Sequence, residues 1–360
     1  MATKITNYQC PACTGPLHFG TASGKLECEY CGLSFDVKII EELYADKERA
    51  ASAQREPEQE ASAGGGEWSE EESAHLRAYA CPSCGAELIC DDTTAATSCP
   101  YCGNPSVIST QFSGNLRPDC VIPFHLDKNA AVSALKQYYK GKRFLPKSFA
   151  DGNHIQEIKG VYVPFWLFDG KSEGNLNFQG TRVQVFRRGN EEVTVTDHFR
   201  VVREGTVAFE KVPVDGSSKM PNAHMDAIEP FDYGDLKAFS TAYLPGFLAD
   251  KYDQDSAQCR DRAYERIKAS TEDALAATAR GYATLRQESG TVRLQKCNAK
   301  YALLPVWMLA TRWEGKDFLF AMNGQTGKLV GALPIDWMKF WLWFFGISLP
   351  LMGLMGLILL

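Results

Sequence analysis

The sequence lacks the motifs of the common enzyme classes. It has no H-E-x-x-H metal motif, no G-x-S-x-G nucleophile turn, no G-x-x-x-x-G-K-[ST] phosphate loop and no dinucleotide fingerprint. No two of its six histidines lie close together in the chain: His18, His75, His125, His154, His198 and His224. We therefore predict a protein without catalytic or cofactor-binding residues, with an enzyme of an unrecognised class as an alternative.

An excess of basic residues is also missing. The chain has 38 Lys and Arg against 44 Asp and Glu, for a net charge of −6. Binding to a phosphate backbone requires clustered Lys and Arg side chains, and neither cysteine-rich region described below carries such a cluster. We expect no nucleic-acid partner. Nucleic-acid binding stays as an alternative function because zinc ribbons of transcription and replication proteins have it.

Charge is absent from residues 340–360, which read FWLWFFGISLPLMGLMGLILL. A run of this length matches the thickness of a hydrocarbon core, and the tryptophans at its start favour the headgroup level. These features predict a C-terminal transmembrane helix over 337–360, with a buried helix as the alternative. Because Lys328 and Lys339 precede the run, we expect a single-pass protein of the cell membrane with residues 1–336 in the cytoplasm. Its glycines would face another transmembrane helix: Gly346, Gly353 and Gly356.

Cysteines, in contrast, are plentiful and regularly spaced. Residues 10–31 read CPACTGPLHFGTASGKLECEYC, and residues 81–102 read CPSCGAELICDDTTAATSCPYC. Each stretch holds two C-x-x-C pairs separated by fourteen residues, which is the pattern of a zinc ribbon. Disulfides are the alternative, but no signal peptide precedes the first pair and a reducing compartment is expected. We predict two structural Zn²⁺ ions held by eight ligands: Cys10, Cys13, Cys28, Cys31, Cys81, Cys84, Cys99 and Cys102.

Glycines follow the cysteine pairs closely, as Gly15, Gly32, Gly85 and Gly103. A glycine at this place lets the backbone turn around a metal ion. The other four cysteines have no spacing that suggests a third site, and we expect them to be buried thiols: Cys90, Cys120, Cys259 and Cys297.

Composition divides the chain into five segments. We predict zinc ribbon one over 1–40, a flexible acidic linker over 41–75, zinc ribbon two over 76–118, a β-rich α+β cytoplasmic domain over 119–336 and the C-terminal helix over 337–360. The linker assignment rests on eleven acidic against three basic residues between Glu41 and Glu72, with few apolar residues among them. The predicted fold class is therefore a multidomain α+β protein.

Within the β-rich domain, the patterns predict helices over 127–141 and 255–282 and several strands separated by Gly, Asn and Asp turns. Two of these strands share a Pro-hydrophobic-Trp core, at Pro164-Phe165-Trp166 and Pro305-Val306-Trp307. An internal duplication and chance similarity both account for this repeat. An acidic group lies at 224–235, and a solvated loop is favoured over a divalent-cation site at its members: Asp226, Glu229, Asp232 and Asp235.

Several stretches together resemble the membrane-anchored bacterial proteins called TFIIB-type zinc ribbon-containing. They are the two C-P-x-C ribbons, GVYVPFWLFDG, VPVDGSSKMPNAHMDAIEPFDYGDLKAFSTAYLPGFLADKYD and FAMNGQTGKLVGALP before the apolar tail. The resemblance implies membrane anchoring and association with phage-shock protein A or flotillin-like (SPFH) proteins. The function predicted from residues and resemblance together is a membrane-anchored adaptor that presents protein-binding modules at the cytoplasmic face, in envelope stress.

Overall fold

The structure is a computed structural model. It describes residues 10–12, 17–21, 23–28, 31–40, 64–69, 72–73, 76–91, 98–104, 108–110, 116–150, 155 and 157–359. Most of the predicted linker, 41–63, and the predicted zinc ligand Cys13 lie outside these residues.

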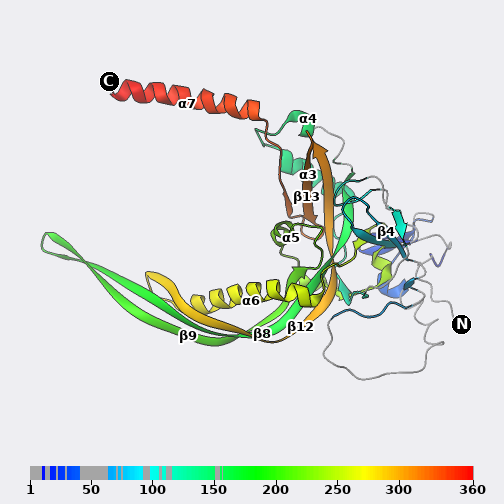
Figure 1. Cartoon of the computed structure of the whole chain (residues 1–360), viewed down its shortest axis with the longest axis horizontal. Helices are drawn as coiled ribbons and strands as arrows, with labels where there is room; N and C mark the ends of the chain where they lie inside the picture. Colours follow the sequence, from blue (N-terminus) through cyan, green and yellow to red (C-terminus); the bar gives the residue numbers. More distant parts are fainter. Residues whose placement is uncertain are drawn as a thin grey trace.

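The described chain forms a three-stranded sheet, an eleven-stranded sheet, helices packed against the larger sheet and a C-terminal helix that leads away from it (Figure 1). The strands are β1 (Leu17–Gly20), β2 (Lys25–Cys28), β3 (Ser34–Phe35), β4 (Leu76–Ala80), β5 (Glu87–Asp91), β6 (Ile108–Thr110), β7 (Cys120–Val121), β8 (Lys159–Arg188), β9 (Glu191–Asp215), β10 (Lys237–Ala238), β11 (Leu248–Asp250), β12 (Thr284–Trp313), β13 (Lys316–Asn323) and β14 (Leu329–Gly331). The helices are α3 (Lys128–Tyr139), α4 (Lys147–Ala150), α5 (Asn222–Ile228), η2 (Tyr233–Asp235), η3 (Thr241–Tyr243), α6 (Ser256–Thr278) and α7 (Trp337–Leu359).

Two long strands, β8 and β12, cross the core of the body side by side. The predicted Pro-hydrophobic-Trp segments meet here, because Leu303 pairs with Pro164 and Tyr301 pairs with Trp166 in an antiparallel register. Both segments are continuous apolar runs and are buried throughout, as expected for strands covered on both faces. The two similar sequences thus occupy the same environment at the centre of the sheet.

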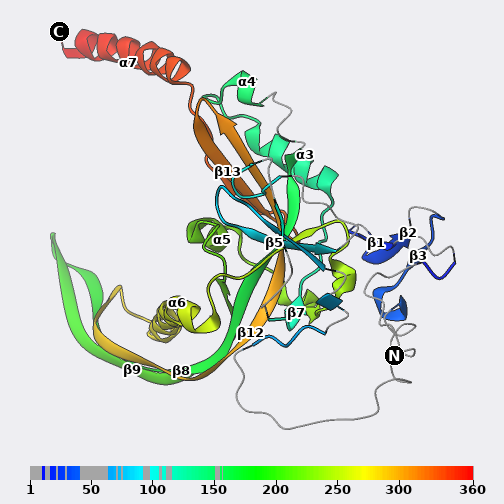
Figure 2. The same cartoon turned by 45° about the vertical axis from the view of Figure 1, so that its right-hand side comes forward.

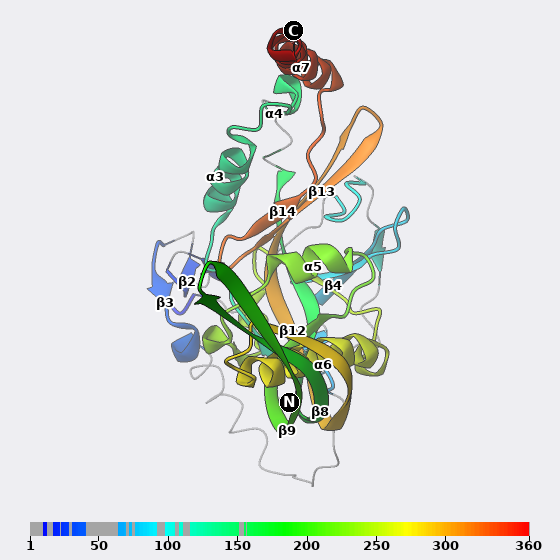
Figure 3. The ribbon, with the colours of Figure 1, turned by 90° about the vertical axis from the view of Figure 1, so that its left-hand side faces the viewer.

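Beyond the body, β8, β9 and the first half of β12 continue as a curved three-stranded arm, made of residues 170–188, 191–209 and 284–297 (Figures 1 and 3). Helix α6 lies along its concave face. Leu176, Phe178 and Val201 of the arm form a small buried cluster with Leu275 of the helix. The arm therefore has its own core, separate from that of the body.

The glycines that were expected to end the strands lie inside them. The predicted strands 160–170 and 175–188 are one strand, β8, and the two predicted strands that follow are β9. A Cβ atom on Gly174 would come within 2.5 Å of Leu275 Cδ1, and one on Gly180 within 2.7 Å of Tyr282 Cδ1. Gly174 therefore permits close approach of a neighbouring group instead of forming a turn, and Gly180, which lies inside the predicted strand 175–188, has the same role.

The predicted helices and tight turns are confirmed. The N-cap of helix α3 is Asp127, the first residue of the predicted helix 127–141, and its carboxylate accepts a hydrogen bond from Ala130 N at 2.7 Å. Helix α6 begins with a capping box. The Asp255 carboxylate accepts a hydrogen bond from Gln258 N, and the Gln258 side-chain oxygen accepts one from Asp255 N. The turn at Glu314-Gly315 joins β12 to β13, with positive φ angles of 48° and 76°.

The two ribbons are attached to the body in different ways (Figure 2). Strands β4, β5 and β6 of ribbon two belong to the large sheet, because Ile89 in β5 pairs with Ala249 in β11, which in turn pairs with Tyr162 in β8. Ribbon one is a separate three-stranded sheet, and its Phe19 ring contacts the Tyr243 ring edge-on at 5.3 Å.

The C-terminal apolar run forms helix α7, which leads away from the body (Figure 1). Across the described part of the chain, no helix combines the length and the apolarity needed to span a membrane. The predictions of a transmembrane helix at 337–360 and of a single-pass location in the cell membrane are therefore wrong. The run has no charge, but it is interrupted by glycine, Ser348 and Pro350, and absence of charge is a weaker criterion than sustained apolarity.

Candidate metal centres

The C-x-x-C turns share one backbone geometry in the three places where the structure describes it. The glycine after each pair donates a hydrogen bond to the carbonyl of the first cysteine: Gly32 to Cys28 at 2.8 Å, Gly85 to Cys81 at 2.8 Å and Gly103 to Cys99 at 3.0 Å. These glycines have φ angles of 70°, 69° and 70°. A side chain would strain this left-handed conformation, so the predicted role of the glycines is confirmed at these three turns.

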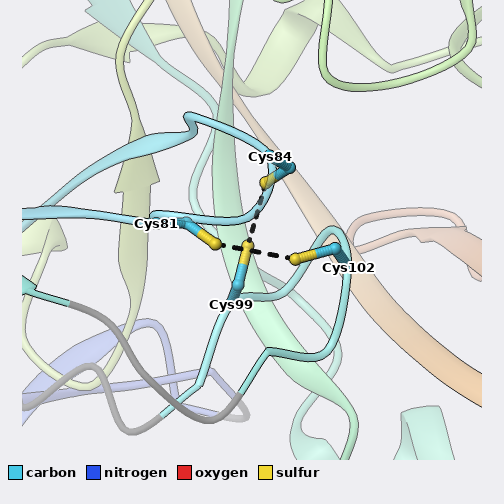
Figure 4. A group of neighbouring side chains, drawn as sticks. All are labelled: Cys81, Cys84, Cys99 and Cys102. Carbon is cyan, nitrogen blue, oxygen red and sulfur yellow. Dashed lines mark hydrogen bonds between the residues drawn. The ribbon is translucent and has the colours of Figure 1, made fainter.

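In ribbon two the turns bring four sulfur atoms together (Figure 4). The Sγ atoms of Cys81, Cys84, Cys99 and Cys102 all lie within 4.8 Å of one another. Two of the separations, Cys81 to Cys102 and Cys84 to Cys99, are 3.6 Å. A tetrahedral zinc ion with Zn–S bonds of about 2.3 Å places its ligands about 3.8 Å apart. The four thiols therefore fit one Zn²⁺ ion.

Electrostatics in ribbon two also favour a bound cation. Burial raises the pKa of Cys84 to about 11 and raises that of Cys99 further. Burial acts in the same direction on Cys81, but the backbone amides of Cys84 and Ser83 outweigh it and lower the Cys81 pKa to about 7. Four thiolates in this small volume require a compensating positive charge, which a zinc ion supplies.

Ribbon one carries the second cluster. Cys10, Cys28 and Cys31 lie within 4.8 Å of one another, with Cys10 and Cys31 sulfurs at 3.5 Å. Cys13, the predicted fourth ligand, lies outside the described residues. The protein thus has two zinc sites, as predicted. With all four positions of ribbon two taken by thiolates, that ion is structural and leaves no open position for a substrate.

The other cysteines lie apart from the two clusters. Cys90, Cys120 and Cys259 are buried as predicted, whereas Cys297 is only half-buried. Burial raises the pKa of Cys120 and of Cys259 to about 12, so both stay protonated thiols at neutral pH.

The acidic group at 224–235 does not converge on one point. Asp226 and Glu229 form ion pairs with arginines of α6, including a contact of Arg266 with both carboxylates. Asp235 instead accepts a hydrogen bond from Gln325 at 2.6 Å. The carboxylates therefore join structural elements, and Asp226 lies in helix α5 instead of in the expected solvated loop.

The segment 224–235 and the turn NGQTG at 323–327 are held against each other by side-chain hydrogen bonds. Buried Asn323 donates to the carbonyls of Ile228 and Pro230 at 3.0 and 3.2 Å. Gln325 accepts from Asp232 N at 2.8 Å. Two of the stretches that carry the family resemblance are thus parts of one structural unit, a relation that no spacing in the sequence indicates.

Two residues near ribbon two were not predicted. Lys159 donates from its Nζ atom to the carbonyl and the hydroxyl of Ser98, next to the ligand Cys99, and so brings a positive charge towards a site whose thiolates carry net negative charge. Asp250 at the end of β11 is 2% exposed and faces the Tyr101 and Ser217 hydroxyls. Only the fold brings these residues to the ribbon, since they lie far from it in the sequence.

Comparison with known proteins agrees with this geometry. Residues 9–38 match the Trm112p-like protein family. A Bacillus subtilis (strain 168) protein named "Uncharacterized protein YdjG" is 35% identical over 319 residues, which span 75% of this chain and 94% of that protein. The chain belongs to the YdjG family. No solved structure matches it.

The similarity to YdjG extends beyond the two ribbons. It covers 75% of this chain, whereas the ribbons and the linker, residues 1–118, make up less than a third of it. The predicted resemblance is confirmed only as far as a zinc ribbon, since the family that matches ribbon one is Trm112p-like. Neither comparison connects YdjG or this chain with TFIIB-type, phage-shock or flotillin-like proteins.

Proposed function

We propose that the protein is a non-catalytic zinc-ribbon scaffold that binds a protein partner through the tip of its arm. The arm tip consists of residues 182–188 of β8 and 191–196 of β9. It extends past the end of β12, whose first residue Thr284 pairs with Thr181. Four apolar side chains of the tip are 38 to 56% exposed: Val183, Val185, Phe186 and Val195. This exposure is the observation that carries the proposal, because clustered apolar side chains on a surface mark interaction sites.

The tip combines two features of a strand-binding surface. Its β8 edge has no neighbouring strand among the described residues, so its backbone groups are available to an added strand. Its apolar side chains also lie on both faces, with Val183 and Val185 on one and Phe186 on the other. An extended peptide with alternating apolar side chains fits this surface.

Ribbon one offers a second contact surface in the same proposal. Leu33 and Ile39 in this small module are 47% and 54% exposed. When one contact forms, it raises the effective concentration for the second contact, so two weak contacts to one partner reinforce each other. An oligomeric partner can offer both contacts at once. The resemblance noted in the sequence makes an oligomer of the phage-shock or flotillin-like kind the first partner to test.

The test compares two versions of the arm tip in the full-length protein. Replacing Val183, Val185 and Phe186 by Thr keeps strand-forming residues but removes the apolar surface. The matched control replaces the two valines by Ile and Phe186 by Tyr, which keeps it. After purification from the native host, we expect the control to retain the co-purifying partner and the Thr variant to lose it. Equal recovery of the partner with both variants contradicts the proposal.

A further inference from the structure

Strand β9 is the outer strand of the arm along its whole length. It pairs with β8 from Glu191 to Asp215 and with no other described strand. The opposite side of β8 is covered by β12 as far as Thr181. The outer edge of β9 therefore presents a long row of backbone N–H and C=O groups, and such an edge is a template for pairing with another strand.

The side chains of β9 alternate between the two faces of the arm. Val201 is buried against α6, so the even-numbered residues next to it lie on the opposite, outer face. In the middle of this face lie Arg200, Val202 and Glu204, all three exposed, with Val202 at 48%. Arg200 makes a long hydrogen bond to Asn177 Oδ1 at 3.5 Å, and neither Arg200 nor Glu204 forms an ion pair within the described residues. Four residues of extended strand keep the two side chains out of mutual reach.

We propose that two copies of this chain associate by antiparallel pairing of their β9 edges, about a two-fold axis at Val202. In this register Val202 lies against the partner's Val202. Arg200 lies opposite the partner's Glu204, and the symmetry creates this ion pair twice. The outer face of the joint sheet then has an apolar contact at the axis and an opposite-charge pair on each side of it, which are favourable cross-strand neighbours.

Charge disfavours several of the other registers, and the register at Val202 gives two Arg–Glu pairs. About a two-fold axis perpendicular to the sheet, paired residues must have side chains on the same face. One residue of each copy therefore lies opposite its own counterpart, and the axis passes between the two. Axes at Asp197, Arg200, Arg203 or Glu204 place like charges directly opposite each other. An axis at Gly205 opposes Arg200 to the partner's Glu210, but β9 is irregular there.

That irregularity also limits the paired segment. Lys211 has a φ angle of 57°, and the register between β8 and β9 shifts at this point. A bulge of this kind interrupts regular pairing. We infer that the shared segment runs from about Val195 to about Phe209, which are opposite each other when the axis lies at Val202.

Charge reversal on the full-length protein tests the pairing, with the dissociation constant of the dimer measured by sedimentation. In a dimer of Arg200→Glu, the new carboxylate lies opposite the partner's Glu204 in both pairs. In a dimer of Glu204→Arg, the new guanidinium lies opposite the partner's Arg200 in both pairs. Each single variant should dimerise at least tenfold more weakly than the wild type. Arg286→Glu reverses an exposed arginine on the same face of the arm, but on β12 at the side opposite the β9 edge, and should leave the dissociation constant unchanged.

Two rescue experiments separate pairing from a general effect of charge. The double variant Arg200→Glu/Glu204→Arg restores both opposite-charge pairs and should dimerise as the wild type does. An equimolar mixture of the two single variants should form a heterodimer, because every pair then joins a carboxylate and a guanidinium. A wild type that stays monomeric, single variants that dimerise normally, or a mixture that does not associate would each overturn the proposal. The result is independent of the proposed function, since only self-association is measured.

Discussion

Asp250 offers a direct test of the energetics around ribbon two. Its side chain is almost completely buried, and neither carboxylate oxygen has a hydrogen-bond partner within the described structure. Burial raises the pKa of Asp250 to about 7, although the nearby hydroxyls of Ser217 and Tyr101 act to lower it. In the unfolded chain the same carboxyl has a pKa of about 3.9. The folded protein therefore keeps a proton that the unfolded chain releases.

The sign of the resulting pH dependence follows from proton binding. Between about pH 4 and pH 7 the unfolded state binds fewer protons at this position, so the free energy of unfolding decreases as pH rises. The decrease is about 1.4 kcal/mol per pH unit and reaches about 4 kcal/mol once the folded carboxyl has ionised. Asp250→Asn has nearly the same shape and no charge, and it removes this contribution. Relative to wild type, the variant should therefore gain stability as pH rises.

Urea unfolding followed by tryptophan fluorescence measures this difference. With zinc present, the free energy of unfolding of Asp250→Asn relative to wild type should increase by about 2 kcal/mol between about pH 5.5 and about pH 7.5. Asp317→Asn, at a side chain that is 76% exposed, is the control and should give a constant difference over this range. Parallel stability curves for wild type and Asp250→Asn would show that the buried carboxyl titrates as it does in the unfolded chain, and would refute the reasoning.

Further predictions concern the metal sites and the arm. Full-length protein purified without chelator should release two zinc ions per chain on denaturation, and one or none would contradict the two-site assignment. Cys84→Ser should remove one zinc and lower the main unfolding temperature, because ribbon two is part of the large sheet, whereas Cys10→Ser should remove one zinc and leave the main transition nearly unchanged. Arg266→Met should cost about 1.5–3 kcal/mol in urea unfolding, since it leaves the half-buried Glu229 unpaired. Gly174→Val should cost about 1–3 kcal/mol by pressing on Leu275 of α6, and no loss would mean that the helix yields freely.

Local signals in the sequence predicted local structure well. The C-x-x-C-G turns, the Asp127 helix cap and the Glu314-Gly315 turn each depend on a few adjacent residues, and each is present. The two zinc sites follow from the same kind of signal, since ligand spacing along the chain fixes a ribbon.

Features that depend on residues far apart in the chain could not be predicted, because no short stretch of sequence contains the residues that cause them. Gly174 lies between two predicted strands, where a turn was expected, but it is a strand residue whose missing side chain admits Leu275. Ribbon two joins the large sheet because β5 pairs with β11, which follows it by more than 150 residues. The approach of Lys159 and Asp250 to ribbon two depends on that same pairing. The prediction for the C-terminal run is wrong for another reason: its length, its lack of charge and its tryptophans together indicate a membrane span only where apolarity is sustained.

The two zinc ions have unequal structural roles, and the difference follows from strand connectivity. Ribbon two places Tyr101 against Asp250 of β11, β11 pairs with β8 at Val161 and Tyr162, and β8 continues without a break to the arm tip. Zinc at this site therefore stabilises the platform from which the arm extends. Ribbon one is joined to the body by side-chain packing, as between Phe19 and Tyr243, and shares no strand with the large sheet. Loss of its zinc would remove the proposed contact surface of ribbon one, while the arm keeps its support.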